Sequence, residues 1–186
     1  MISGERINLR LFRDERDVEE YVTLYNDLAE RSLADHTEIT PVVGRLSEFR
    51  ETGFWADDRG TMLITTKDDR VVGSIGFIRN TDLELGIGYR LLRREDRGQG
   101  YMSEALRLFY AYLFETKLHI TRLAILTAAD NTGSRRLAVK CGYTQEGILR
   151  QAYFYRGRVC DWVVYGLLRE ECPPPQLGLS LNEKVG

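Results

Sequence analysis

Apolar and polar positions alternate at the start of the chain and then take up a helical spacing. Residues 6–12, RINLRLF, have the period of two that is typical of a β-strand. Residues 14–30 place their large apolar side chains at helical spacing, which predicts an amphipathic helix. Residues 44–55 are compatible with a short second helix. The large apolar residues of the first helix are Val18, Tyr21, Val22 and Tyr25.

The middle of the chain predicts three strands in succession. Residues 61–80 form two β-rich runs joined by a polar turn at residues 67–70, which is typical of a hairpin. Residues 82–92, DLELGIGYRLL, predict the third strand, and a helical pattern begins near Gly100. The remaining pattern is strand, helix, strand and strand, in residues 122–129, 131–142, 144–154 and 158–168.

Residues 82–92 have one apolar face and one face that is nearly bare backbone. Glycine inside a strand often marks the close approach of a ligand or of another chain, and a β-bulge is the alternative interpretation. We expect the apolar face to belong to the core. The core face holds Leu83, Leu85, Ile87, Tyr89 and Leu91, and the other face holds Glu84, Gly86, Gly88 and Arg90.

A glycine turn stands directly before the next helix. Gly98 and Gly100 flank Gln99, and the first turn of a helix offers unpaired N–H groups and the positive end of the helix dipole. Glycines let such donors curl around an oxyanion without a Cβ in the way. The turn therefore predicts an anion site, and a phosphate fits it best. The apolar face of the helix holds Met102, Leu106, Phe109 and Leu113.

Two common phosphate loops do not fit this turn. A Walker A loop requires a lysine after its last glycine, and none follows Gly100. A dinucleotide fingerprint requires a third glycine where Ser103 stands. A nucleotide-binding dehydrogenase is therefore disfavoured.

Composition limits the classes of protein that remain. A length of 186 residues fits a single mixed α/β domain, which we place at residues 1–171, followed by a proline-rich, non-periodic tail at 172–186 that is expected to fray. The net charge of −2 supplies no basic field for nucleic acid. Three cysteines without CxxC spacing and only two histidines argue against a disulfide framework and a metal centre. No apolar run approaches the ~20 residues of a membrane span, and no signal peptide stands at the N-terminus, so we expect a cytoplasmic protein.

The turn resembles the acyl-CoA loop of the GNAT N-acetyltransferases, whose pattern is Arg/Gln-x-x-Gly-x-Gly/Ala. Here it reads Arg97-Gly98-Gln99-Gly100-Tyr101-Met102, and Met102 departs from the small final residue. A second segment, residues 130–147, is similar to the family's Asn-x-x-Ser stretch followed by Lys-x-Gly-Tyr and Glu-Gly. The segments GIGYRLL, RGQGYMSEAL and RQAYFYRGRVCDWVVY resemble most closely the RimJ/RimL-like branch, which acetylates ribosomal protein N-termini.

The resemblance implies an α/β (α+β) GNAT fold over one domain. That fold has a mixed, mostly antiparallel central sheet of about six to seven strands, flanked by about four helices, with a splayed strand pair that binds acyl-CoA. The order β-α-α-β-β-β-α-β-α-β-β is expected between Ile7 and Leu168. The state implied is a monomer or a homodimer.

The resemblance also implies roles for residues of the donor site. Backbone groups of Arg90, Leu91 and Leu92 would pair with pantetheine, and Asn131 would touch the pantetheine arm. Amides of the turn that begins after Arg97 would hold the pyrophosphate. Those amides belong to the segment that includes Gly98, Gln99, Gly100, Met102 and Ser103.

For catalysis, the resemblance places Ser134 against the thioester sulfur. Many relatives carry a tyrosine acid where this chain has Ala138, so Ser134 is the predicted acid; a hydroxyl that only solvates the first helical turn is the alternative. Glu84, acting through a water, is one predicted base, and an exposed carboxylate without function is its alternative. Tyr153 or an ordered water is the other predicted base that would accept the proton of the amine.

The sequence gives the least information about the residues that would bind the acceptor amine. Asp35 and His36 fall between the first two helices, where relatives usually roof the acceptor groove, and a solvated loop is the alternative. Trp55 either lines that groove or belongs to the core. Arg156 and Arg158 are expected at an exposed hairpin tip.

The expected reaction is transfer of an acetyl group from acetyl-CoA to an amine. The acceptor is a protein or peptide α-amine on the closer resemblance. A small amine such as a polyamine, an antibiotic or an amino-acid-like toxin is the alternative, and a non-catalytic acyl-CoA-binding regulator is a third. No metal is expected.

Overall fold

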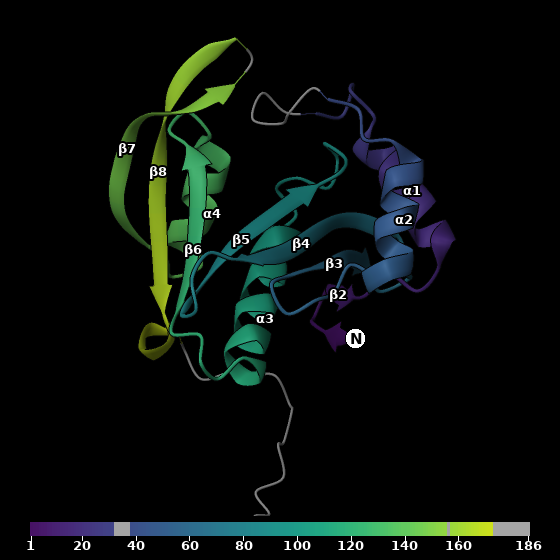
Figure 1. Cartoon of the computed structure of the whole chain (residues 1–186), viewed down its shortest axis with the longest axis horizontal. Helices are drawn as coiled ribbons and strands as arrows, with labels where there is room; N and C mark the ends of the chain where they lie inside the picture. The colour runs from purple at the N-terminus through teal and green to yellow at the C-terminus, as the bar shows by residue number, and fades with distance from the viewer. Residues whose placement is uncertain (32–37, 156, 173–186) are drawn as a thin grey trace, which may run out of the picture.

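The computed structural model describes residues 1–31, 38–155 and 157–172, and it is built on one mixed sheet (Figure 1). The strand order is β1-β2-β3-β4-β5-β6-β8-β7, and every pair is antiparallel except β5 and β6. The strands are β1 (Ile2–Ser3), β2 (Ile7–Arg10), β3 (Arg59–Thr66), β4 (Val71–Arg79), β5 (Glu84–Leu91), β6 (Arg122–Ala128), β7 (Thr144–Tyr155) and β8 (Arg158–Leu168).

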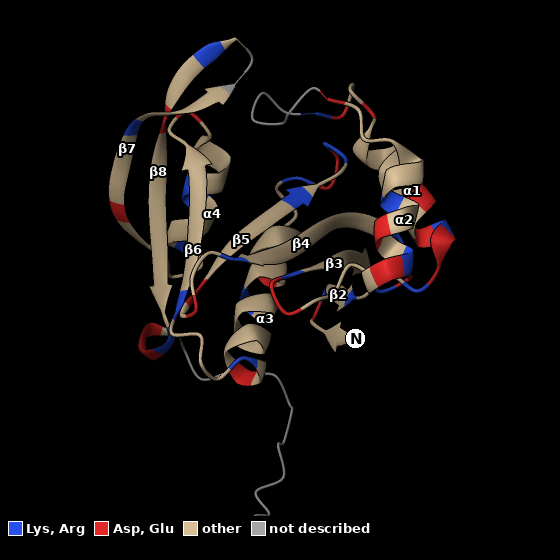
Figure 2. Ribbon diagram, viewed as in Figure 1, with Lys and Arg blue, Asp and Glu red and all other residues tan. Residues whose placement is uncertain are grey.

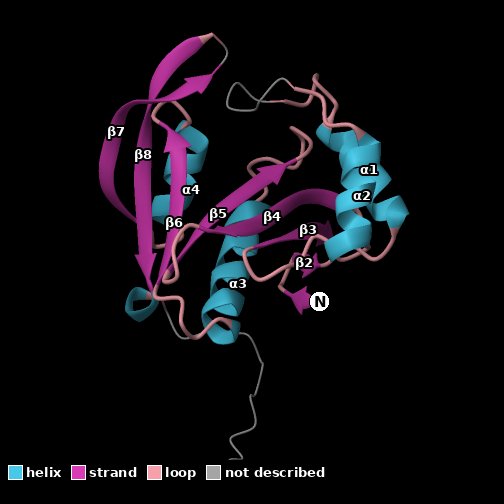
Figure 3. Ribbon diagram, viewed as in Figure 1, coloured by secondary structure: helices cyan, strands magenta, loops and turns pink. Residues whose placement is uncertain are grey.

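The helices cover both faces of the sheet (Figure 3). Side chains alternate along β3, so Met62 and Ile64 face one core with α3, while Leu63 faces a second core with α1. The four predicted apolar residues of α3 are all buried. The helices are α1 (Glu15–Tyr25), α2 (Val42–Thr52), α3 (Tyr101–Thr116) and α4 (Thr132–Lys140), with a 3₁₀ turn at Arg169–Glu171.

The order of elements from β2 to β8 is the predicted one. The α/β GNAT fold, with a mixed sheet and four helices, is confirmed. The sheet has eight strands rather than six or seven, because the two-residue β1 adds a short edge strand beside β2. Of the predicted tail at 172–186, only Cys172 belongs to the described residues, so the domain boundary stays a prediction.

The parallel strands β5 and β6 separate after a short paired stretch. They are in register at only three pairs of residues, the last of which joins Gly86 to Ala124. Beyond that point β5 stays paired with β4 as far as Leu91, and β6 stays paired with β8 as far as Ala128. The two halves of the sheet therefore diverge like the arms of a V, as the directions of β5 and β6 in Figure 1 show.

An ion-pair cluster fixes the closed end of this V. The guanidinium of Arg122, on β6, donates to the carboxylates of Glu84 on β5 and of Glu146 on β7. Asn80 donates a further hydrogen bond of 2.8 Å to Glu84. Three strands are thus tied together at the point from which the arms open.

The assignment of Leu83 to the core face of β5 is wrong. Leu83 is 56% exposed, because β5 begins one residue later and Leu83 lies in the loop that leads into it. Its carbonyl accepts a hydrogen bond of 3.0 Å from the amide of Thr121. The other predicted face residues are buried or half-buried. Among the described helices, none is both long enough and apolar enough to cross a membrane.

Candidate functional site

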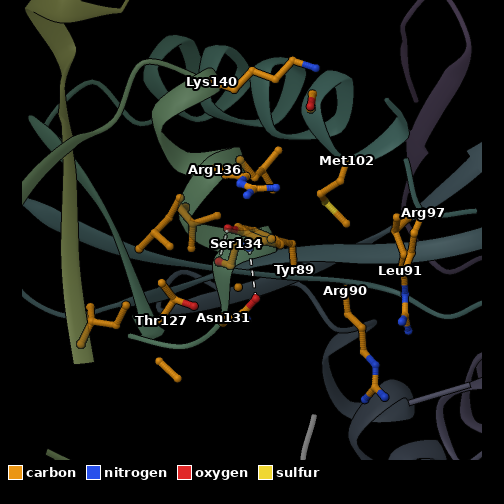
Figure 4. Close-up of a pocket in the computed structure, with 18 of the residues that line it drawn as sticks. Tyr89, Arg90, Leu91, Arg97, Met102, Thr127, Asn131, Ser134, Arg136 and Lys140 are labelled. Carbon is orange, nitrogen blue, oxygen red and sulfur yellow. Dashed lines mark hydrogen bonds between the residues drawn. The ribbon is translucent and has the colours of Figure 1, made fainter. Parts of the chain in front are cut away.

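A cavity of about 650 Å³ opens where β5 and β6 separate (Figure 4). Its walls come from β5, from the turn before α3, from the first residues of α3, from β6 and from α4. Segments far apart in the sequence therefore meet in one place. The predicted site residues that line it are Arg90, Leu91, Arg97, Gly98, Gly100, Met102, Ser103, Asn131, Ser134 and Tyr153.

The glycine turn forms one end of this cavity. Gly98 and Gly100 have φ angles of +77° and +85°, which side chains with a Cβ rarely adopt. Gly100 is the N-cap of α3, and no side chain among the described residues caps the helix. Met102 and Ser103, which belong to the first turn of that helix, line the cavity. An anion at this end would meet amides and the positive pole of the helix.

Two predicted residues are not part of the cavity lining. The carbonyl of Gln99 accepts a hydrogen bond of 2.9 Å from Arg6. Leu92 is buried, and its N–H donates to the carbonyl of Val72 at 2.9 Å. The pairing of Leu92 with a ligand stays a prediction, and this contact counts against it, because the amide already extends the pairing of β5 with β4.

Three cationic residues line the same cavity in addition to Arg90. Arg97 comes from the glycine turn, and Arg136 and Lys140 come from α4 (Figure 4). In Figure 2 the ribbon is blue, the colour of Lys and Arg, at the end of β5 and on α4. Arg136 and Lys140 were not predicted as site residues, because a basic stretch of helix is usually only a solvated face. Together with the turn they make the cavity suited to an anionic ligand.

Asn131 and Ser134 occupy the first turn of α4. The Asn131 side chain is the N-cap, and its Oδ1 accepts the amide hydrogen of Ser134 at 3.1 Å. Such a cap satisfies a donor that would otherwise be unpaired. The cap fixes the backbone of Ser134 and leaves its hydroxyl to the cavity.

The Ser134 hydroxyl has a partner that the sequence did not indicate. The Tyr89 hydroxyl oxygen lies 2.8 Å from Ser134 Oγ (Figure 4). Burial raises the pKa of Tyr89 to about 12, although the hydrogen bond with Ser134 acts in the opposite direction. Tyr89 was predicted as a core residue, and its ring is half-buried, but its polar end reaches the cavity. The only hint of this contact in the sequence was that Tyr89 carries the one hydroxyl on an otherwise aliphatic face of the strand.

A second cavity, of about 830 Å³, lies against the first. It is open on one side and is lined mainly by β4, β5 and side chains of α1 and α2. A Cβ placed on Gly88 would meet no described atom within 4 Å, so the bare backbone of β5 leaves open space at the boundary. The residues that line both cavities are Ile87, Gly88, Tyr89, Arg90, Leu126 and Trp162.

Glu84 lies on the wall of the second cavity, but its carboxylate is engaged. Burial raises its pKa, yet the hydrogen bonds from Asn80 and Arg122 outweigh burial and hold the pKa of Glu84 below its ordinary value. A carboxylate in this state is a weak base. The base role of Glu84 stays a prediction, and these contacts count against it.

Aromatic residues close the β7–β8 side of the first cavity. The ring of Tyr153 stacks on Trp162, with centroids 4.9 Å apart and an interplanar angle of 26°. Trp55 is half-buried and packs edge-on against Phe77, so it belongs to the core and lines neither cavity.

Of the four remaining predicted residues, Arg158 is the one that the structure describes, and it lines neither cavity. Arg158 is exposed near the hairpin tip, as expected, and forms an ion pair with Asp130. Asp35, His36 and Arg156 lie outside the described residues. Within the part of the chain that the structure describes, no group of three or more His, Cys, Asp or Glu residues is arranged to hold a metal ion.

Comparison with known proteins agrees with this geometry. Residues 6–144 match the family described as an acetyltransferase (GNAT) domain. A probable N-acetyltransferase of Bacillus subtilis, YjcK, is 31% identical over 131 residues, which cover 68% of this chain and 71% of YjcK.

Two solved structures share the fold. The first is RimL, a ribosomal alpha-N-protein acetyltransferase in complex with coenzyme A; it has a TM-score of 0.73 and 22% identity, and the match covers 89% of this chain and 95% of RimL. The second is spermidine N-acetyltransferase from Vibrio cholerae in complex with CoA and spermine, with a TM-score of 0.75, 16% identity, and coverage of 90% and 98%. The family match over residues 6–144 includes the glycine turn and the strands β5 and β6 that form the open V. The chain therefore belongs to the GNAT family of N-acetyltransferases.

Proposed function

We propose that this N-acetyltransferase moves an acetyl group from acetyl-CoA directly to the α-amine of a protein or peptide. The observation that carries the proposal is the meeting of two cavities at Gly88 and Tyr89, beside the Ser134 hydroxyl. One cavity has the features of an anion site, and the other offers an approach for the acceptor. Direct transfer requires the two substrates to be held in contact, and adjoining cavities supply that geometry.

Acetyl-CoA suits the first cavity because the molecule is a chain with phosphates at one end. Amides of the turn from Gly98 to Ser103 would bind the pyrophosphate, and the cations Arg136 and Lys140 would balance phosphate charge. Asn131 and the edge of β5 that turns away from β6 would hold the pantetheine arm. The thioester would then lie near Ser134.

The residues at the boundary of the two cavities would donate and accept protons during acetyl transfer. The acceptor amine is mostly cationic at neutral pH and must lose a proton before its nitrogen forms the C–N bond. When the C–S bond breaks, its electron pair goes to sulfur, and the Ser134 hydroxyl would donate a proton there. Glu84 through a water, and Tyr153, stay the predicted bases.

The walls of the second cavity favour a peptide over a polyamine. Two arginines, Arg45 and Arg90, line it, and the only carboxylate among its described lining residues is Glu84, which is paired with Arg122. A polycation such as spermine would meet positive charge on these described walls without an uncommitted carboxylate to offset it. A peptide brings one α-ammonium group and an otherwise extended chain, which suits an open groove.

The proposal is tested by thiol release from acetyl-CoA with a panel of acceptors. The panel holds peptides with varied free N-termini, spermidine and spermine, free amino acids and an aminoglycoside. Release with peptides is the expected result. Release with one small amine alone would replace the proposed acceptor and keep the chemistry. Tight binding of acetyl-CoA without release by any acceptor would favour a regulator and contradict the proposal.

The proposed phosphate site predicts that Gly100→Ala weakens the binding of acetyl-CoA about tenfold, a factor that corresponds to ~1.4 kcal/mol. Alanine is strained at a φ of +85°, and its Cβ would lie 3.0 Å from the guanidinium of Arg6, so the turn must shift its amides. Isothermal titration calorimetry with acetyl-CoA measures the change in Kd.

Gly53→Ala is the matched control for this variant. Gly53 ends α2 with a φ of +61° and lines neither cavity, and a Cβ at this position would meet no described atom within 4 Å. We expect the variant to lower the melting temperature through the same kind of backbone strain while leaving Kd unchanged. Equal loss of affinity in both variants would show that strain alone, and not the turn, explains the effect.

A further inference from the structure

Tyr89 is a half-buried tyrosine whose hydroxyl meets a serine at the boundary of the two cavities. Its hydroxyl is within 2.8 Å of the Ser134 hydroxyl, and its ring belongs to the boundary shared by the two cavities. The hydroxyl of Tyr143, by contrast, is buried without a hydrogen-bond partner within the described structure. The distinguishing feature of the Tyr89–Ser134 pair is its place, because Tyr89 lines both cavities and Ser134 lines the first one.

We propose that Tyr89 is a positioning residue that donates its hydrogen bond to Ser134 Oγ and thereby turns the serine O–H toward the leaving sulfur. This inference rests on the proposed function. A serine hydroxyl rotates freely and has one proton to give. When its oxygen accepts from Tyr89, the Ser134 O–H points away from Tyr89 and can donate into the cavity that Ser134 lines.

Only a protonated tyrosine can make this donation. Because burial raises the pKa of Tyr89 to about 12, the hydroxyl keeps its proton throughout the neutral and mildly alkaline range. Burial is therefore sufficient to keep the Tyr89 phenol protonated. The groups whose charges act on it are Cys141 and Tyr165, and both raise its pKa further.

The step balances without a net change at Tyr89. The C–N bond forms and the C–S bond breaks, the sulfur takes the Ser134 proton, and the serine oxygen recovers a proton from water. Water in turn receives the proton that the acceptor nitrogen releases. Tyr89 remains a donor before and after the reaction, so its effect is on the orientation and acidity of Ser134.

A double-mutant cycle of Tyr89→Phe and Ser134→Ala tests the inference by steady-state kinetics. Tyr89→Phe should lower kcat roughly three- to tenfold, the effect of one hydrogen bond, with an unchanged KM for acetyl-CoA. In the Ser134→Ala background, Tyr89→Phe should lower kcat no further. An unchanged kcat in Tyr89→Phe, or equal losses in both backgrounds, would overturn the inference.

A second variant separates donation from packing. Difluorotyrosine placed at position 89 alone keeps the ring and the hydroxyl but lowers the pKa of the phenol. The kcat of this variant should then decline at a lower alkaline pH than that of the wild type, because the phenolate cannot donate. Identical pH profiles would contradict the inference.

Tyr143→Phe is the matched control, because it removes a buried hydroxyl that has no hydrogen-bond partner in the described structure and lines neither cavity. It should leave kcat and its pH profile unchanged. Wild-type protein that transfers no acetyl group would contradict the proposed function and the inference together. Wild-type turnover with an unaffected Tyr89→Phe variant would contradict the inference alone.

Discussion

Replacing Ser134 with alanine should lower kcat for acetyl transfer roughly a hundredfold or more, which is the usual contribution of a general acid. The thiolate would then leave without a proton donor, while the contacts that hold acetyl-CoA would remain. The KM for acetyl-CoA should therefore change little. Steady-state thiol release at saturating acceptor measures both constants.

The structure explains why this variant should fold normally. The cap of α4 uses the backbone N–H of residue 134 and the side chain of Asn131, so alanine preserves it. Thr132→Ala is the control, because it removes an exposed hydroxyl from the same helix turn without touching either cavity. If kcat were unchanged in Ser134→Ala, the serine would only solvate the helix terminus, and the proton would reach sulfur by another route.

Replacing Gly88 with valine should reduce kcat/KM by at least about a hundredfold, the scale of loss that a displacement of ~1 Å at a reacting centre can cause. A side chain at this position would enter the space shared by the two cavities, because no described protein atom lies within 4 Å of its Cβ. It would separate the thioester from the amine. Both substrates would still bind at their outer ends.

The variant should fold normally, because a Cβ at position 88 meets no described atom within 4 Å and valine is well suited to a strand. Gly147→Val is the matched control. Gly147 lies on β7 and lines neither cavity, and a Cβ added there would likewise have no described neighbour within 4 Å. It should retain full activity. Full activity in Gly88→Val as well would mean that transfer does not occur at this boundary.

Periodicity in the sequence was sufficient for most of the fold. Alternation identified β2 and β5, and two β-rich runs around a polar turn identified the β3–β4 hairpin. Helical spacing identified α1 and α3, because each helix buries one face against a core. The error at Leu83 concerns where β5 begins. The ends of strands depend on the hydrogen bonds of neighbouring strands, which no local pattern records.

The glycine turn was predictable because its chemistry is local. The positive φ angles of Gly98 and Gly100 and the start of α3 directly after Gly100 follow from a few consecutive residues. The engagement of Glu84 was not predictable, because its partner Arg122 is 38 residues away. Only the parallel pairing of β5 with β6 brings the two together.

The hydrogen bond of Tyr89 with Ser134 was not predictable from the sequence either. Alternation placed its ring on the core face of β5, and the ring is half-buried there. Alternation does not reveal whether the far end of a long side chain meets apolar atoms or a polar partner. The contact with Ser134 spans 45 residues and exists because α4 packs beside the open end of the V.

The measurement that tests the account most directly is mass spectrometry of a peptide incubated with the wild-type protein and acetyl-CoA. Fragmentation locates the added acetyl group on the α-amine or on a side chain. The account predicts acetylation of the α-nitrogen, with release of one CoA thiol for each acetyl group transferred. An unmodified peptide, together with acetylation of a small amine by the same protein, would contradict it.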